Sequence, residues 1–204
     1  SWRCRRPQLH RLRTGADNVR AFLKGLVKEI KAWHPTGLVS YANFPSTEYL
    51  TIDFTDFVCF NVYLHQENAF RRYIARLHNL AVDRPLVLTE FGMDSFREGA
   101  PHQAETLAWQ VKTAFELGCA GTCVFAWTDE WYTGGHLIED WAFGLVDKDR
   151  QPKPALASIT EQYSGKLPPV LPRAPKVSVV VCAYNAERTM DQCLASLEHL
   201  DYPD

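Results

Sequence analysis

The feature that most constrains the fold is an alternation of strand-like and helix-like segments between about residues 38 and 163. Four runs of β-forming residues predict strands, and they cover residues 38–41, 57–61, 86–89 and 122–127. Amphipathic helix patterns occupy the intervals between them. Strands that alternate with helices predict an α/β protein with a parallel sheet.

The first helix is predicted to begin at Asp17 as its N-cap. Its apolar face carries Val19, Phe22, Leu23, Leu26, Val27 and Ile30. Further helices are predicted around residues 70–77, 104–115 and 154–163, with one helical turn at 46–50. Four strand–helix units would be half of an eightfold barrel, which needs about 250 residues. A small open α/β sheet is the competing architecture.

The composition favours a globular chain with a divided organisation. Of its 204 residues 46% are hydrophobic and 23% charged, and the net charge of −2 gives no reason to expect a nucleic-acid partner. Residues 1–16 are basic and lack periodicity, which indicates either a basic arm or a solvated or non-native end. A domain at 17–163 precedes a Pro-rich linker at 164–176. Residues 177–204 hold one predicted strand and one helix, too little for a core of their own.

Cysteine usage and hydropathy bear on location. Cys59, Cys123 and Cys182 fall in strand-like runs and Cys193 on an apolar helix face, which predicts reduced, buried thiols in a cytoplasmic protein. No second Cys/His pair accompanies Cys119 and Cys123, so no metal site is expected. No apolar stretch reaches the roughly 18 residues of a membrane-spanning helix, so no membrane segment is expected in this chain.

Polar and aromatic residues follow each predicted strand, and in a parallel sheet these ends meet at one edge. They are Asn43, then Asn61 and Tyr63 with His65 nearby, then Glu90, then Trp127, Asp129, Glu130 and Trp131. Carboxylates, amides and aromatic faces together suit a sugar ligand. Each residue also has a structural interpretation: Glu90 as the partner of an Arg, Trp127 as core, and the other carboxylates as solvated loop charges.

Residues 17–163 resemble the C-terminal half of a clan A glycoside hydrolase barrel, strands five to eight. Residues 57–63 (FVCFNVY), 85–92 (PLVLTEFG) and 121–127 (GTCVFAW) resemble strands six to eight. The stretch FGLVDKDRQPKP at 143–154 resembles the segment after strand eight in β-glucuronidase-like and β-galactosidase-like enzymes.

The resemblance implies retaining hydrolysis of O-glycosidic bonds in a glycan or glycoside, without a cofactor. It makes Glu90 the nucleophile, Tyr63 its hydrogen-bond partner and Trp127 the sugar platform. Asn43, Asn61, Asp129, Glu130 and Trp131 become further substrate contacts.

The acid/base Glu of that family lies at the end of strand four, and no such residue precedes Asp17. Retaining hydrolysis needs two carboxyl groups about 5–5.5 Å apart. The chain alone is therefore expected to be inactive, with a missing N-terminal barrel half as its partner. The alternative is a non-catalytic glycan-binding or scaffold module.

Residues 176–185 (KVSVVVCAYN), the helix after them and LDYPD at 200–204 resemble the first unit of a family 2 glycosyltransferase. This resemblance implies that Ala183, Tyr184 and Asn185 contact a nucleotide sugar. A divalent metal and a nucleotide sugar are expected only for the complete domain, because its acidic residues are absent here. Together the two resemblances predict a fragment of a bifunctional carbohydrate-active protein.

Overall fold

The computed structural model describes residues 15–165, 176, 178–181 and 183–199. The chain divides into two compact units, Ser1–Gly165 and Lys166–Asp204. The basic start and most of the Pro-rich segment lie outside the described residues, so the interpretations of both stay predictions.

The larger unit is built on a four-stranded parallel sheet in the order β1-β2-β3-β4. The strands are β1 (Ala42–Asn43), β2 (Val58–Asn61), β3 (Leu86–Phe91) and β4 (Gly121–Val124). Each strand pairs in parallel with the next one along the chain. The parallel sheet predicted from the alternation is confirmed.

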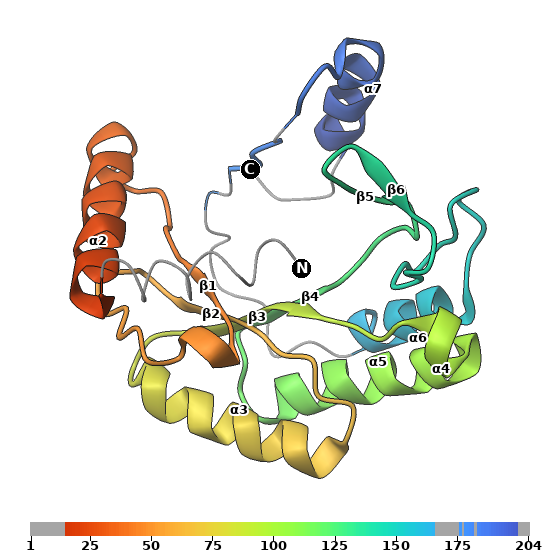
Figure 1. Ribbon diagram of the computed structural model, residues 1–204, viewed down its shortest axis with the longest axis horizontal. Helices are drawn as coiled ribbons and strands as arrows, with labels where there is room; N and C mark the ends of the chain where they lie inside the picture. Colours follow the sequence, from red (N-terminus) through yellow and green to blue (C-terminus); the bar gives the residue numbers. More distant parts are fainter. Residues whose placement is uncertain (1–14, 166–175, 177, 182, 200–204) are drawn as a thin grey trace. The chain divides into compact units, whose positions relative to one another are not determined.

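Three long helices cover one side of this sheet (Figure 1): α3 (Glu67–Ala81), α5 (Ala100–Glu116) and α6 (Pro154–Tyr163). The core lies where their apolar faces meet the sheet, and it includes Phe60, Phe70, Ile74, Leu77, Leu86, Leu88, Leu107, Val111 and Ile159. A Pro at the start of both α5 and α6 fits the helix because its missing N–H would have no helical partner. All three predicted helices are confirmed.

The first helix, α2 (Ala16–Trp33), stands apart from these three (Figure 1). Its predicted apolar face is largely exposed, since Val19 is its one buried residue. Asp17 is not its N-cap: the helix begins after Gly15, and Asp17 lies in the first turn, where a carboxylate favours the helix dipole.

Several predicted strands differ in extent. The strand expected at 38–41 is instead β1, two residues long, and the one expected at 122–127 ends at Val124. The single turn expected at 46–50 is the 3-10 turn Pro45–Thr47. Glu90 lies inside β3 rather than after it. A strand ends where its hydrogen bonds to the neighbouring strand end, and local β-propensity does not indicate that position.

An antiparallel hairpin, β5 (Trp131–Thr133) and β6 (His136–Ile138), lies between β4 and α6, where no strand was predicted. A short helix, α4 (Ser95–Glu98), precedes α5. Of the cysteines predicted to be buried, Cys59 is buried, Cys193 is only partly buried and Cys123 is exposed, and position 182 lies outside the described residues. Cys119, for which burial was not predicted, is also buried.

In the smaller unit, the predicted helix is confirmed as α7 (Glu187–Glu198). Residues 178–181 form no strand, and positions 177 and 182 lie outside the described residues. A strand needs a neighbour to satisfy its backbone N–H and C=O groups, and the described part of this unit offers none.

Candidate functional site

Glu90 and Tyr63 lie together at the carboxyl edge of the sheet. Tyr63 follows β2, and its hydroxyl donates a hydrogen bond to Glu90 Oε2 over 3.1 Å. The strand register places Asn61 of β2 opposite Glu90 of β3, and Val62 N donates to the Glu90 carbonyl over 2.7 Å. The sheet therefore holds both the backbone and the side chain of Glu90.

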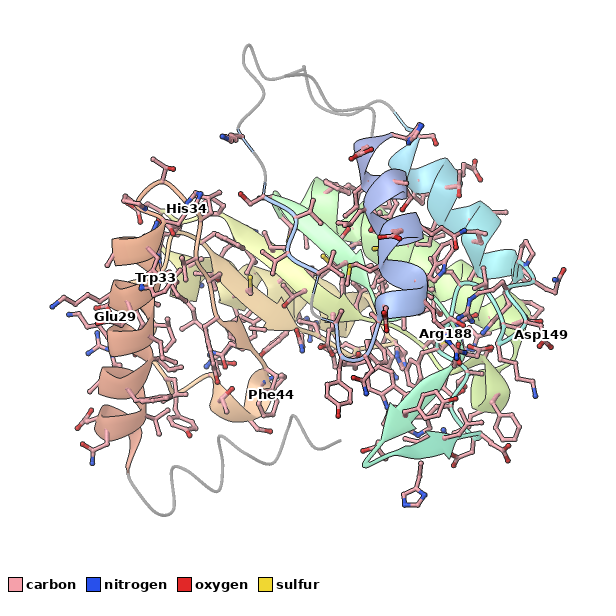
Figure 2. The ribbon with its side chains drawn as sticks, turned by 90° about the horizontal axis from the view of Figure 1, so that it is seen from above. Glu29, Trp33, His34, Phe44, Asp149 and Arg188 are labelled. Atoms are coloured by element: carbon pink, nitrogen blue, oxygen red, sulfur yellow. The ribbon has the colours of Figure 1, made fainter. Side chains whose placement is uncertain are left out.

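Asn61 is the second polar group beside Glu90. Its amide oxygen accepts a hydrogen bond from Thr89 Oγ1 over 2.8 Å, which leaves its N–H groups to donate to a ligand. Asn61 and Glu90 both line a cavity of about 310 Å³. The other lining residues are Phe44, Pro45, Tyr63, Leu64 and Tyr73. Phe44 projects from the turn that follows β1 (Figure 2).

The ring of Tyr63 rests on two further aromatic rings. Its centroid lies 6.3 Å from that of Phe125 and 6.2 Å from that of Phe143, both edge to face. Phe125 and Phe143 also contact each other at 5.6 Å. Such pairs are each worth about 0.5–1.5 kcal/mol beyond the area they bury. This aromatic brace, Phe125 with Phe143, limits the positions from which Tyr63 can reach Glu90.

Phe143 is in turn fixed by polar contacts to the residues on either side of it. Lys153 Nζ donates to Asp129 Oδ1 and to the Ala142 carbonyl, both over 3.0 Å. Asp129 Oδ1 also accepts from Gly144 N over 2.7 Å. Lys153 and Asp129 are largely buried, at 11% and 18% side-chain exposure, so the pair is shielded from solvent screening.

Gln103 on α5 ties the same segment to the end of β3. It is fully buried, and its Nε2 donates to the Met93 carbonyl over 2.9 Å and to the carbonyls of Ala142 and Gly144 at 3.3 and 3.4 Å. Gln110, two turns later, donates to the Leu64 carbonyl over 2.9 Å. One helix thus anchors the backbone after β2, after β3 and beside Phe143.

Gly92, directly after β3, lets the backbone there lie close to the backbone at Phe125. A Cβ built on it would lie 2.2 Å from the Phe125 carbonyl oxygen, so any side chain would force backbone apart. His65 Nε2 lies 2.8 Å from the Gly92 carbonyl oxygen, which places the predicted neighbour of Tyr63 in a backbone contact.

The remaining predicted site residues lie elsewhere. Asn43 is buried, and its amide oxygen accepts from Phe44 N over 2.9 Å and from the Thr47 hydroxyl, which stabilises the turn after β1. Trp127 is 57% exposed and does not line the cavity beside Glu90. Trp131 stacks on Trp141 with ring centroids 6.2 Å apart.

Asp129 and Glu130 are engaged by cations, Lys153 and Arg150 respectively, the latter pair at 2.6 Å. Both carboxylates line a second, open cavity of about 690 Å³ beside the hairpin. The structure therefore brings together Glu90, Tyr63 and Asn61 in the wall of one cavity, which the other predicted contacts do not line. Trp131 lies behind it, with its ring centroid 5.1 Å from that of Phe125. The substrate roles of all these residues stay predictions.

Ala183, Tyr184 and Asn185 belong to the smaller unit. All three are exposed, Tyr184 at 91%, and Asn185 has a left-handed backbone with φ of 51°. Asn tolerates this conformation better than most residues, so the chain can turn there into α7. Within the described residues no group of three or more His, Cys, Asp or Glu side chains is arranged to hold a metal ion. No described helix is long and apolar enough to cross a membrane.

Comparison with solved structures relates the fold to glycoside hydrolases. A β-D-glucuronidase of Dictyoglomus thermophilum superposes with a TM-score of 0.63 at 18% identity, over 77% of this chain and 31% of that one. A family 2 β-galacturonidase of Eisenbergiella tayi gives 0.59 at 19%, over 72% and 30%. A xylanase of Cellvibrio japonicus gives 0.53 at 18%, over 71% and 55%.

At these identities the likeness shows the fold alone: a parallel α/β sheet resembling glycoside hydrolase barrels. The chain spans about 30% of the length of the two uronidases. No protein-family profile matches the sequence, and no curated protein sequence is significantly similar to it.

Sequence reasoning missed most of the cavity wall and the supports behind it. Tyr73 reads as part of a helix face, and Gln103 as a solvated helix residue. Phe143 lies in a stretch that the resemblance covers, but nothing in its own sequence context indicates contact with Tyr63. Within the cavity wall, the sequence pointed only to Glu90, Tyr63 and Asn61, because each lies at or just after the end of a predicted strand.

Proposed function

We propose that this chain is part of a carbohydrate-active protein whose larger unit is one half of a retaining glycoside hydrolase barrel, strands five to eight. Glu90 acts as the nucleophile and Tyr63 holds its carboxylate. The observation that carries the proposal is the hydrogen bond from Tyr63 to Glu90 Oε2, at the carboxyl edge of a parallel sheet and beside a ligand-sized cavity. The likeness to glycoside hydrolase folds supports it.

In the proposed step, a carboxylate oxygen of Glu90 forms a bond to the anomeric carbon. The bond from that carbon to the leaving oxygen breaks, and the leaving group departs with the electron pair. Among the described residues Glu90 is the one carboxylate that lines the cavity. The proton that an ordinary alcohol leaving group needs must then come from a second carboxyl group, which the missing half would supply. The chain alone does not turn over unactivated glycosides.

The smaller unit is proposed to begin a family 2 glycosyltransferase domain, which makes the parent protein bifunctional. The support is the turn at Tyr184 and Asn185 directly before α7, with the Tyr184 ring exposed. Nucleotide-sugar and metal binding are proposed only for the complete domain.

The test uses a glycosyl donor that needs no general acid. A 2,4-dinitrophenyl 2-deoxy-2-fluoro-β-glycoside releases a stable phenolate, and its fluorine slows hydrolysis of the glycosyl–enzyme ester. We expect the chain, offered glucosyl and glucuronyl versions in parallel, to gain the mass of one sugar, located by peptide mapping on Glu90. Glu90→Gln should remain unlabelled.

Glu116→Gln, which alters an exposed carboxylate on α5 paired with Arg71, is the matched control and should label like the wild type. Failure of both donors to label wild-type protein, together with measurable binding of unreactive glycosides, would instead support the non-catalytic glycan-binding module. That second candidate is favoured by the single carboxylate of the cavity.

A further inference from the structure

The cavity beside Glu90 constrains the charge of the sugar, an inference that rests on the proposed function of the site. At about 310 Å³ it lies at the lower end of the range for ligand cavities, which runs from about 300 to 1,000 Å³. A cavity of about 150 Å³ is enough for benzene. The space therefore fits one six-membered ring with its substituents.

Most of the cavity wall is apolar. Phe44, Pro45, Leu64 and the rings of Tyr63 and Tyr73 form it. The Tyr73 hydroxyl donates to Glu48 Oε2 over 3.0 Å, and burial with this hydrogen bond raises the pKa of Tyr73 far above its usual value. Tyr73 thus stays neutral and presents ring surface, of the kind on which the C–H face of a pyranose packs.

The polar part of the cavity is small and lies at Glu90 and Asn61. Glu90 accepts from Tyr63 through one oxygen, so its other oxygen can accept from a ligand hydroxyl. Asn61 presents amide N–H groups, because its oxygen is taken by Thr89. A sugar ring could satisfy both residues if one of its hydroxyls donates to Glu90 and another accepts from Asn61.

None of the described residues that line this cavity carries a positive charge. Three cations of the segments that follow β3 and β4 are paired: Lys153 with Asp129, Arg150 with Glu130, and Arg97 with Asp94 and Asp140. On α3, Arg76 is paired with Glu48, the carboxylate that accepts from Tyr73. A ligand carboxylate would enter an apolar space beside the Glu90 carboxylate, with no cation among the described lining residues to offset the repulsion. Repulsion between two neighbouring carboxylates is strong in a partly desolvated site, and it disfavours binding of the ligand.

We propose that this cavity binds a single uncharged pyranose ring and discriminates against uronic acids. This preference for an uncharged sugar would distinguish the chain from the two uronidases that its fold resembles, since those proteins are named for uronide substrates. The discrimination comes from what surrounds Glu90, which the shared fold does not determine.

The experiment compares two ligands that differ only at C6: 4-nitrophenyl β-D-glucoside, with a hydroxymethyl group, and 4-nitrophenyl β-D-glucuronide, with a carboxylate. Their dissociation constants are measured by ligand-observed NMR titration with the full 204-residue chain at pH 7. We expect the glucoside to bind at least about tenfold more tightly. Glu90→Gln should lower the ratio of the glucuronide dissociation constant to the glucoside dissociation constant, because it removes the repelling charge. Asn61→Asp should raise this ratio, because it adds a second negative charge.

Glu116→Gln is the matched control, because it removes an equal charge outside the cavity and should leave the ratio unchanged. Equal or tighter binding of the glucuronide would overturn the inference, while labelling of Glu90 by the activated donors would still uphold the proposed function. If neither ligand binds, the cavity is not a sugar site and the inference also fails. If Glu116→Gln narrows the ratio as much as Glu90→Gln, the discrimination comes from net charge and not from this cavity.

Discussion

Helices α5 and α2 both belong to the larger unit, yet their patterns of burial are nearly opposite. On α5, four polar residues, Gln103, Thr106, Gln110 and Thr113, are at most 1% exposed. On α2, the apolar residues Phe22, Leu26, Ile30 and Trp33 are 45–89% exposed, and Figure 2 shows Trp33 at the end of the helix with His34 just after it. Side-chain polarity alone therefore does not predict which residues of these two helices are buried.

The two helices are also held by different interactions. α5 lies in the apolar core, and its buried glutamines donate to backbone carbonyls of the site segments. α2 is held through ion pairs, Arg20 with Asp53 at 2.5 Å and Lys31 with Asp56 at 2.7 Å. Core contacts therefore set the stability of the unit, whereas α2 contributes through a few solvent-accessible charges. An uncovered apolar face on α2 is where a missing barrel half would pack if the proposed architecture holds.

Paired leucine truncations give the largest expected difference between the two helices. Leu107→Ala on α5 removes a fully buried side chain and should lower the free energy of unfolding by about 3 kcal/mol. Leu26→Ala on α2, at 45% exposure, should change it by less than about 0.5 kcal/mol. Guanidinium unfolding of both variants measures this. Equal losses would mean that the α2 face is covered in solution.

Gln103→Ala tests the buried polar contacts of α5. It leaves the Met93 carbonyl without its side-chain donor inside the fold, so we expect a loss of about 2 kcal/mol in the free energy of unfolding. His102→Ala, one residue earlier and 51% exposed, is the control and should cost far less. A loss at Gln103 no larger than at His102 would contradict an anchoring role.

Phe143→Ala asks whether the aromatic brace behind Tyr63 matters for Glu90. If the brace positions Tyr63, labelling of Glu90 by the activated donor should slow by roughly tenfold in both Phe143→Ala and Tyr63→Phe, with little further loss in the double variant. Phe115→Ala, which removes a ring paired with Tyr163 in the helix layer, should leave the labelling rate unchanged. Multiplicative losses in the double variant would show that the two residues act separately.

The smallest expected effect concerns the charges that hold α2. The hydrogen bond from Lys31 and that from the Val39 N–H lower the pKa of Asp56. Its stabilising contribution is therefore complete above the unfolded-state pKa of about 3.9 and is lost as the pH falls through the lower folded-state value. Asp56→Asn should cost about 0.5–1 kcal/mol at pH 6 and progressively less below about pH 3.9, measured by chemical unfolding.

Salt provides a second measurement on the same contacts. Raising NaCl to 1 M should increase amide hydrogen exchange in α2 and leave α5 almost unchanged, because the charges that hold α2 are accessible to screening ions. A salt response of equal size in both helices would contradict the contrast between them.

The sequence alone determined the alternation of strands and helices, and with it the parallel sheet and the place of Glu90 at the edge where Tyr63 and Asn61 follow the neighbouring strand. Period and propensity are local properties, so a single chain reveals them. It could not indicate that Gln103 is buried or that Phe22 is exposed, since burial depends on which surface a helix meets. Only the tertiary structure decided the extent of β1 and β4, the wall of the cavity and the brace behind Tyr63, because each depends on contacts between residues far apart in the chain.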